Sequence, residues 1–151
     1  MRYLEVQKDL FTIKQDCYYA QCISADFGMG KGIAVDFNKH FNMKNKLRQK
    51  YPDYLNIYVN KKLNGDCILE GRVFNLITKE KYYYKPTYKS IENALNKMKE
   101  LAIKNNIKNI AMPMIGCGLD KLKWENVSYI IKKTFNNTDI NIAVCVLKNS
   151  K

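Results

Sequence analysis

The chain has 151 residues, 46% of them apolar, and its 26 Lys and Arg against 14 Asp and Glu give a formal net charge of +12. Such a chain can bury an ordinary hydrophobic core without cross-links, so we expect one domain over residues 1–151. No long apolar run occurs and the first residues lack the apolar centre of a signal peptide, so we expect neither a membrane-spanning nor a secreted protein. We therefore expect a cytoplasmic protein with no membrane partner.

The N-terminal part of the chain predicts two strands followed by two helices. Leu4–Val6 is a short apolar run typical of a strand, and Cys17–Ile23 is a longer one. A helix is expected to begin at Ile33, where apolar residues recur at helical spacing. Met43–Lys50 predicts one or two further helical turns that end near Pro52.

The middle of the chain is rich in residues that favour strands. We expect strand structure at Ile57–Val59, at Cys67–Leu69 and at Val73–Thr78. Asn64-Gly65 and Glu70-Gly71 are turn signals between these runs, and one of the two is expected to close a hairpin.

The C-terminal part alternates helix and strand. Tyr88–Lys104 repeats apolar residues at helical spacing, and Thr87 is placed to cap its first turn. Ile107–Met112 predicts a buried strand, Trp124–Phe135 a further amphipathic helix, and Ile140–Leu147 a final strand. This alternation indicates an α/β fold with a mixed, mostly parallel central sheet and helices on both faces.

Two glycine-bearing loops, Ser24–Gly32 and Met114–Asp120, each follow a predicted strand and precede a predicted helix. Glycines at such turns let backbone N–H groups approach phosphate oxygens, and the helix that follows adds its positive N-terminal end. Because ligands of α/β sheets bind beyond the carboxyl ends of the strands, the two loops together predict a site for a diphosphate-containing nucleotide.

The cysteines and the charge give weaker signals. The five cysteines form no C-x-x-C pair and His40 is the only histidine, so we expect neither a disulfide framework nor a metal site, and no other cofactor. The excess of lysine admits nucleic acid as a partner, although scattered lysines can also reflect composition alone.

Five motifs in order resemble a known family. They are Asp9-Leu10-Phe11, the run Cys22–Ala34 with the first glycine loop, Leu76-Ile77-Thr78-Lys79, Lys85-Pro86-Thr87-Tyr88, and Pro113–Asp120 followed by Trp124-Glu125-Asn126-Val127. Together they are similar to a macrodomain of the terminal ADP-ribose protein glycohydrolase subgroup, over nearly the whole chain. The resemblance implies a single macrodomain over residues 1–151, built as a three-layer α/β/α sandwich.

The same resemblance implies an ADP-ribose site. Asp9 matches an aspartate that recognises adenine. The segment Gly28–Gly32 would bind one phosphate and the inner ribose side, and Ile115–Leu119 would wrap the other phosphate and the distal ribose. From the residues alone, a strand-end turn or helix cap is the better explanation of Asp9, and a helix cap is sufficient to explain Thr87. The implied ligand-binding residues are Asp9, Leu10, Ser24, Gly28, Met29, Gly30, Gly32, Ile33, Thr87, Met114, Ile115, Gly116, Cys117, Gly118 and Leu119.

Lys79 and Asp120 are the implied catalytic residues. In the resembling enzymes a lysine at the end of the Leu-Ile-Thr-Lys strand attacks the anomeric carbon of the distal ribose, and the aspartate of Gly-Leu-Asp acts as acid or base. The pairing is chemically coherent, because an amine is a nucleophile only when it is deprotonated and a carboxylate can relay that proton. Without the resemblance, a solvated strand-end lysine and a loop-closing aspartate would explain both residues.

The implied activity is that of an ADP-ribosyl hydrolase. It would remove mono-ADP-ribose from ester-linked acidic side chains of proteins, and also cleave O-acetyl-ADP-ribose. A DNA-base ADP-ribosyl hydrolase, as in antitoxin macrodomains that resemble this subgroup, and a non-catalytic ADP-ribose reader remain alternatives. The expected partners are ADP-ribose and mono-ADP-ribosylated proteins, and we expect a monomer.

Three further features have open interpretations. Cys117 has no histidine nearby in the sequence, so a packing role is favoured over a nucleophilic one. His40 is expected to be a surface or capping residue. Tyr82-Tyr83-Tyr84 and Tyr88 can stack on a base at the rim of the site, or form an exposed loop or strand edge.

Overall fold

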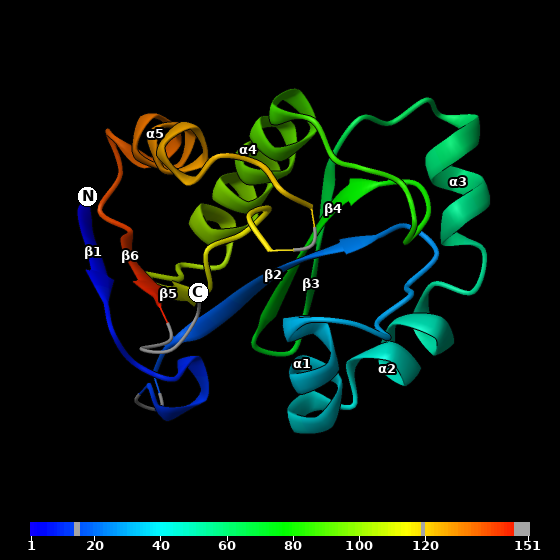
Figure 1. The fold of residues 1–151 in the computed structure, drawn as a ribbon, viewed down its shortest axis with the longest axis horizontal. Coiled ribbons are helices and arrows are strands. Elements are labelled where there is room, and N and C mark those ends of the chain that lie inside the picture. Colours follow the sequence, from blue (N-terminus) through cyan, green and yellow to red (C-terminus); the bar gives the residue numbers. More distant parts are fainter. Residues whose placement is uncertain (14–15, 119, 147–151) are drawn as a thin grey trace.

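The computed structural model describes residues 1–13, 16–118 and 120–146, and its described strands form one sheet (Figure 1). The strands are β1 (Arg2–Val6), β2 (Tyr18–Ser24), β3 (Asp66–Glu70), β4 (Val73–Lys79), β5 (Asn109–Met112) and β6 (Asn141–Cys145). Their order across the six-stranded sheet is β1-β6-β5-β2-β4-β3. All neighbours are parallel except β3 and β4, so the predicted mixed, mostly parallel sheet is confirmed.

The antiparallel pair is the predicted hairpin. Glu70 of β3 lies opposite Val73 of β4, and Gly71 between them has a φ of +57°. Glu70-Gly71 is therefore the hairpin turn, since a positive φ is the conformation for which glycine is preferred. Asn64-Gly65 instead connects a helix to β3.

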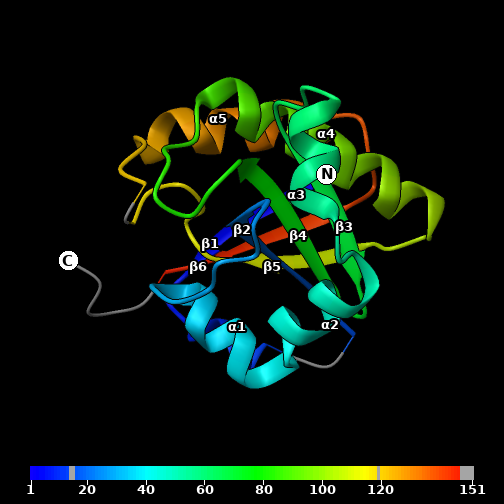
Figure 2. The ribbon, with the colours of Figure 1, turned by 90° about the vertical axis from the view of Figure 1, so that its right-hand side faces the viewer.

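The helices form layers on the two faces of the sheet (Figure 2). The described part of the chain contains α1 (Ile33–Phe41), α2 (Met43–Lys50), α3 (Tyr54–Asn60), α4 (Tyr88–Lys104), α5 (Trp124–Phe135) and a short 3-10 helix, η1 (Leu10–Thr12). Figure 2 shows α4 and α5 on one face and α1 and α2 on the other. The expected three-layer sandwich is confirmed, and α4 and α5 have the predicted bounds. No helix among the described residues is long and apolar enough to cross a membrane.

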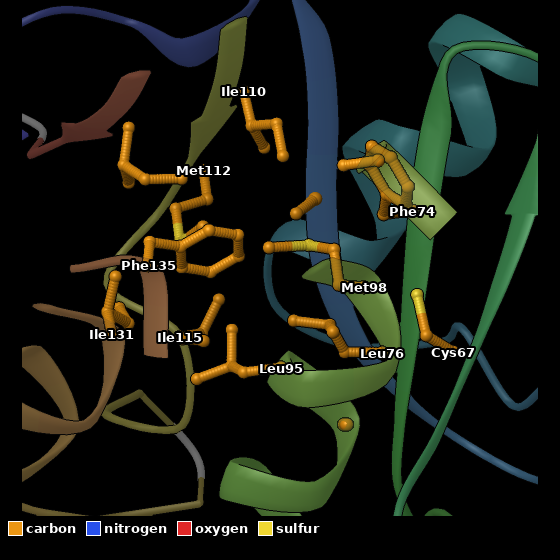
Figure 3. Close-up of a cluster of buried hydrophobic side chains, with 14 of the residues drawn as sticks. Cys67, Phe74, Leu76, Leu95, Met98, Ile110, Met112, Ile115, Ile131 and Phe135 are labelled. Atoms are coloured by element: carbon orange, nitrogen blue, oxygen red, sulfur yellow. The ribbon is translucent and has the colours of Figure 1, made fainter. Parts of the chain in front are cut away.

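Two apolar clusters hold these layers together. The cluster in Figure 3 lies between the sheet and the α4–α5 layer, and Leu76, Met98 and Phe135 are fully buried in it. The second cluster lies on the opposite face, where Phe37 of α1 and Leu47 of α2 are also fully buried. Complete burial of a side chain of this size contributes about 1.5–3 kcal/mol, so the two clusters are the main stabilising feature of the fold.

One expected strand is a helix. Ile57–Val59 lies within α3, which Figure 1 places beyond the β3 edge of the sheet. Tyr54 and Tyr58 are buried at helical spacing while Ile57 and Val59 are exposed. The Tyr54 hydroxyl donates to Asp66, and the Tyr58 hydroxyl accepts the Gly65 N–H at 2.8 Å. These tertiary contacts override the preference of β-branched residues for strands.

The topology brings three loops to one edge of the sheet. β2, β4 and β5 are parallel neighbours, so their carboxyl ends, at Ser24, Lys79 and Met112, lie at the same edge. The chain leaving β2 continues to α1 on one face, whereas the chains leaving β4 and β5 continue to α4 and α5 on the other. This change of face is a topological switch point, where α/β sheets bind their ligands.

Candidate functional site

The first glycine loop begins with a tight turn at the end of β2. The Phe27 N–H donates to the Ser24 carbonyl at 3.0 Å, and Phe27 has a positive φ of 58°. The loop ends at Gly32, which is the N-cap of α1 and has a φ of 65°. Helix α1 therefore begins directly at the loop, with its unpaired N–H groups at the edge that carries the site.

Asp26 organises this loop and ties it to the segment that follows β4. Its Oδ1 accepts the Ser24 hydroxyl and the Gly28 N–H, the latter at 3.1 Å, and its Oδ2 accepts the Tyr82 N–H at 3.2 Å. Sequence reasoning did not select Asp26. The available signal was an aspartate inside a strand-end turn, where its side chain commonly accepts the backbone N–H two residues later.

Two glycines of the loop have opposite surroundings. A Cβ on Gly28 would lie 2.9 Å from the Tyr82 Cβ, closer than real side chains approach. A Cβ on Gly30 would meet nothing within 4 Å. Gly28 is therefore required by the packing of two protein segments, whereas the space beside Gly30 is open.

A bulge at the end of β4 places Lys79. Ile23 of β2 pairs with Ile77, but the next residue, Ser24, pairs with Lys79, so Thr78 is an extra residue in β4. Bulges bend a strand locally and redirect its side chains, and they are frequent beside active sites. The Lys79 carbonyl still accepts the Ala25 N–H at 2.9 Å, which keeps the end of β4 against the first glycine loop.

The structure brings the two predicted catalytic residues together. The Lys79 Nζ lies 2.7 Å from the Asp120 Oδ1, although the residues are 41 positions apart in the sequence. Only 14% of the Lys79 side chain and 16% of the Asp120 side chain are exposed. This amine and carboxylate form a direct, largely desolvated pair that can exchange a proton.

The second glycine loop is shaped around Gly116, whose φ is +74°. The Leu122 N–H donates to the Gly116 carbonyl at 2.8 Å, and the Lys121 N–H donates to the Gly118 carbonyl at 3.2 Å. A Cβ on Gly118 would meet nothing within 4 Å, as at Gly30. Leu119, a predicted ligand-binding residue of this loop, lies outside the described residues.

The hydroxyl of Tyr88 fixes the chain that leaves this loop. It accepts the Lys123 N–H at 3.1 Å and the Asn126 Nδ2 at 3.3 Å. These donors lower the pKa of Tyr88, because they stabilise its charged form. The first turn of α4 is thereby joined to the segment between Asp120 and α5.

Two cysteines lie near the Lys79–Asp120 pair. Burial raises the pKa of Cys22, and the negative charge of Asp120 raises it further. The same two causes raise the pKa of Cys117 to about 11. Both side chains are therefore neutral thiols at physiological pH, which agrees with the expected packing role of Cys117 and not with a nucleophilic one.

Other predicted ligand-binding residues occupy defined structural positions. Asp9 caps η1 by accepting the Phe11 N–H at 3.0 Å, and the neighbouring Leu10 is buried. Thr87 caps α4 in a capping box with Ser90, in which each side chain accepts the backbone N–H of the other residue.

The remaining predicted residues differ in burial: Ser24, Met29 and Ile115 are buried, Ile33 and Met114 are half-buried, and Gly32 is exposed. His40 is exposed on α1 as expected, and its ring stacks on Phe11 with centroids 4.1 Å apart.

Comparisons with known proteins agree with this architecture. The profile of the Macro domain family matches residues 71–131. The ADP-ribose glycohydrolase OARD1 of Bos taurus is 41% identical over 143 residues, which cover 94% of this chain and 90% of that protein.

Solved structures share the fold. The macrodomain of Mycobacterium tuberculosis DarG superimposes with a TM-score of 0.79 at 18% identity, covering 95% of this chain and 96% of that one. Thermosipho africanus DarTG, solved in complex with ADP-ribose, has a TM-score of 0.67 at 19% identity and covers 99% of this chain and 43% of that one. With a near full-length relative at 41% identity, the chain belongs to the macrodomain family, in the terminal ADP-ribose protein glycohydrolase subgroup.

Proposed function

We propose that this protein is an ADP-ribosyl hydrolase that removes single ADP-ribose units from acidic side chains of proteins and also cleaves the related ester O-acetyl-ADP-ribose. The near full-length similarity to an ADP-ribose glycohydrolase supports this activity. The observation that carries the proposal is the 2.7 Å contact between the Lys79 Nζ and the Asp120 Oδ1 at the edge of the sheet where the glycine loops lie. A module that only binds ADP-ribose needs no such pair.

The two glycine loops hold the ligand in this proposal. Backbone N–H groups of Gly28–Gly32 bind one phosphate, and those of Ile115–Leu119 bind the other phosphate and the distal ribose. The open space beside Gly30 and Gly118 is consistent with a backbone that the ligand approaches closely. Asp9, which follows β1 and caps η1, accepts a hydrogen bond from the adenine amine.

The proposed reaction uses the Lys79 amine as the nucleophile and the Asp120 carboxylate as the acid and base. Asp120 takes a proton from the Lys79 ammonium, and the free amine then attacks the anomeric carbon of the distal ribose. The bond from that carbon to the acceptor oxygen breaks, and the acceptor leaves as a carboxylate. The proton on Asp120 then passes to solvent, and the carboxylate takes a proton from a water molecule as the water oxygen bonds to the anomeric carbon. The carbon–nitrogen bond breaks, Lys79 leaves as the amine and regains a proton from Asp120, and free ADP-ribose is released.

A release assay tests the proposal. The purified protein is incubated with an automodified ADP-ribosyltransferase, and free ADP-ribose is measured over time. We expect release by the wild-type protein and none by Lys79→Ala, while calorimetry shows that Lys79→Ala still binds ADP-ribose. Normal turnover by Lys79→Ala would refute the lysine mechanism, and binding without release by the wild-type protein would establish a reader.

The second candidate is a hydrolase that acts on ADP-ribosylated DNA bases. The net charge of +12 favours it, because a strongly basic protein attracts polyanions. Turnover measured side by side on glutamate-linked, serine-linked and DNA-linked ADP-ribose decides between the two. We expect the glutamate-linked substrate to be the fastest.

A further inference from the structure

Three consecutive tyrosines project from the segment that follows Lys79. Tyr82, Tyr83 and Tyr84 are 59%, 61% and 42% exposed, and we refer to them as the tyrosine ridge. Neighbouring rings meet edge to face, with centroids 5.2 Å apart for Tyr82 and Tyr83 and 5.0 Å apart for Tyr83 and Tyr84. The Lys81 Nζ lies over the Tyr83 ring, 6.0 Å from its centroid.

The backbone below the ridge is held at both ends. The Tyr82 N–H donates to Asp26 at 3.2 Å, and the Tyr84 N–H donates to the Lys81 carbonyl at 2.9 Å. After the ridge, Pro86 is buried and Thr87 caps α4. Yet among the described residues, neither apolar cluster includes any of the three rings. The protein therefore orders three large exposed rings without using them in its core.

The ridge lies in the segment that directly follows the reacting lysine. It begins three residues after Lys79, a span of at most about 11 Å, and its first residue also packs against Gly28 of the first glycine loop. In the proposed reaction the ADP-ribose lies along the glycine loops, and the acceptor is attached at the carbon that Lys79 attacks. The ridge is thus at the end of the substrate from which the acceptor chain extends.

We propose that the tyrosine ridge docks the polypeptide that carries the ADP-ribose, and that it favours an acidic segment. This inference rests on the proposed function. Exposed tyrosines in a fixed backbone give large contact area at a small entropic cost, and tyrosine is enriched among the residues that dominate binding interfaces. Apart from Lys79, which is paired with Asp120, the segment 80–85 carries two lysines and one glutamate, and the chain as a whole carries +12, so charge complementarity favours a segment rich in Asp and Glu.

The test compares substrates that differ only in the acceptor. The first is a peptide with an ADP-ribosylated glutamate flanked by Asp and Glu. The others are the same peptide with neutral flanks, O-acetyl-ADP-ribose, and an ADP-ribosylated single-stranded oligonucleotide. The variants are Tyr83→Ala, Tyr84→Ala and their combination, because Tyr82 packs against Gly28. Tyr129→Ala on α5 is the matched control, since that ring is 66% exposed.

We expect the double variant to lower kcat/KM on the acidic peptide by about tenfold or more, mainly through KM. Turnover of O-acetyl-ADP-ribose and the affinity for free ADP-ribose stay within about twofold of wild type, and Tyr129→Ala behaves as wild type on every substrate. The loss on the neutral peptide is smaller than the loss on the acidic one.

Several results overturn the inference. One is a double variant that turns over the acidic peptide as wild type does. Another is an equal loss on the small ester and on the peptide, in which case the rings belong to the ADP-ribose site. A loss confined to the modified oligonucleotide assigns the ridge to nucleic acid, whose bases stack on such rings. If wild type turns over none of the substrates, the proposed function fails. Fluorescence anisotropy with the unmodified acidic peptide then still tests the docking role of the ridge. Weaker peptide binding by the double variant than by wild type supports that role, and equal binding refutes it.

Discussion

Neutralising Lys79 and Asp120 separately and together distinguishes their roles in stability and in catalysis. Lys79→Met keeps the length of the side chain without its charge, and Asp120→Asn keeps the shape of the carboxylate. At the observed 2.7 Å, two unit charges attract by about 6 kcal/mol at an effective dielectric constant of about 20. The desolvation of the two groups, which are only 14% and 16% exposed, offsets most of this attraction.

Each single variant leaves one charge without its partner. We therefore expect each to lower the free energy of unfolding by about 2 kcal/mol, which corresponds to a fall in Tm of about 4–8 °C for a chain of this size. The double variant has neither charge, so its stability should return to within about 1 kcal/mol of wild type. Urea unfolding followed by circular dichroism measures these differences.

Activity should follow a different pattern from stability. Each single variant is expected to lose turnover by about a thousandfold, and the double variant to lose no more than the worse single one, because the two groups act as a unit. A double variant less stable than both single variants contradicts the electrostatic reasoning. Wild-type turnover by Lys79→Met contradicts the assignment of the nucleophile.

The further predictions concern the glycine loops, the Cys117 thiol and the reaction conditions. Gly28→Ala should lower the free energy of unfolding by about 1–3 kcal/mol, because its Cβ would meet Tyr82 at 2.9 Å. Gly30→Ala should change the free energy of unfolding by less than about 0.5 kcal/mol, yet it should weaken ADP-ribose binding in calorimetry. Equal destabilisation by Gly28→Ala and Gly30→Ala would contradict the difference in their surroundings. Asp26→Asn replaces an acceptor of three hydrogen bonds, so it should raise KM and lower kcat together; a change in Tm alone would show that Asp26 only stabilises the fold. Burial raises the pKa of Cys117 from 9.0 to about 11. The thiol of the unfolded chain therefore ionises at a lower pH than that of the folded protein, and the free energy of unfolding should fall between pH 9 and pH 11. Urea unfolding across this range should show a smaller fall for Cys117→Ala than for wild type. Because the proposed reaction uses an amine and a carboxylate, turnover should survive EDTA, and loss restored by a divalent cation would be evidence for a different mechanism.

Local patterns in the sequence were sufficient for much of the fold. The bounds of α4 and α5 match the apolar periodicity, and the cap at Thr87 was predictable from its position before that periodicity begins. The hairpin turn at Glu70-Gly71 was also one of two predicted turns. These features depend on residues a few positions apart, which is why a single sequence contains them.

Tertiary structure alone decided the features that depend on distant residues. α3 is a helix because Tyr54 and Tyr58 find partners in the β3 segment, against the strand preference of Ile57–Val59. The resemblance named Lys79 and Asp120, but their separation of 2.7 Å follows from strand pairing and from the bulge at Thr78. Asp26 reaches Tyr82 across 56 positions, a contact that no local pattern could reveal. Periodicity and turn chemistry act along the chain, whereas the alignment of the parallel strands determines which loops meet.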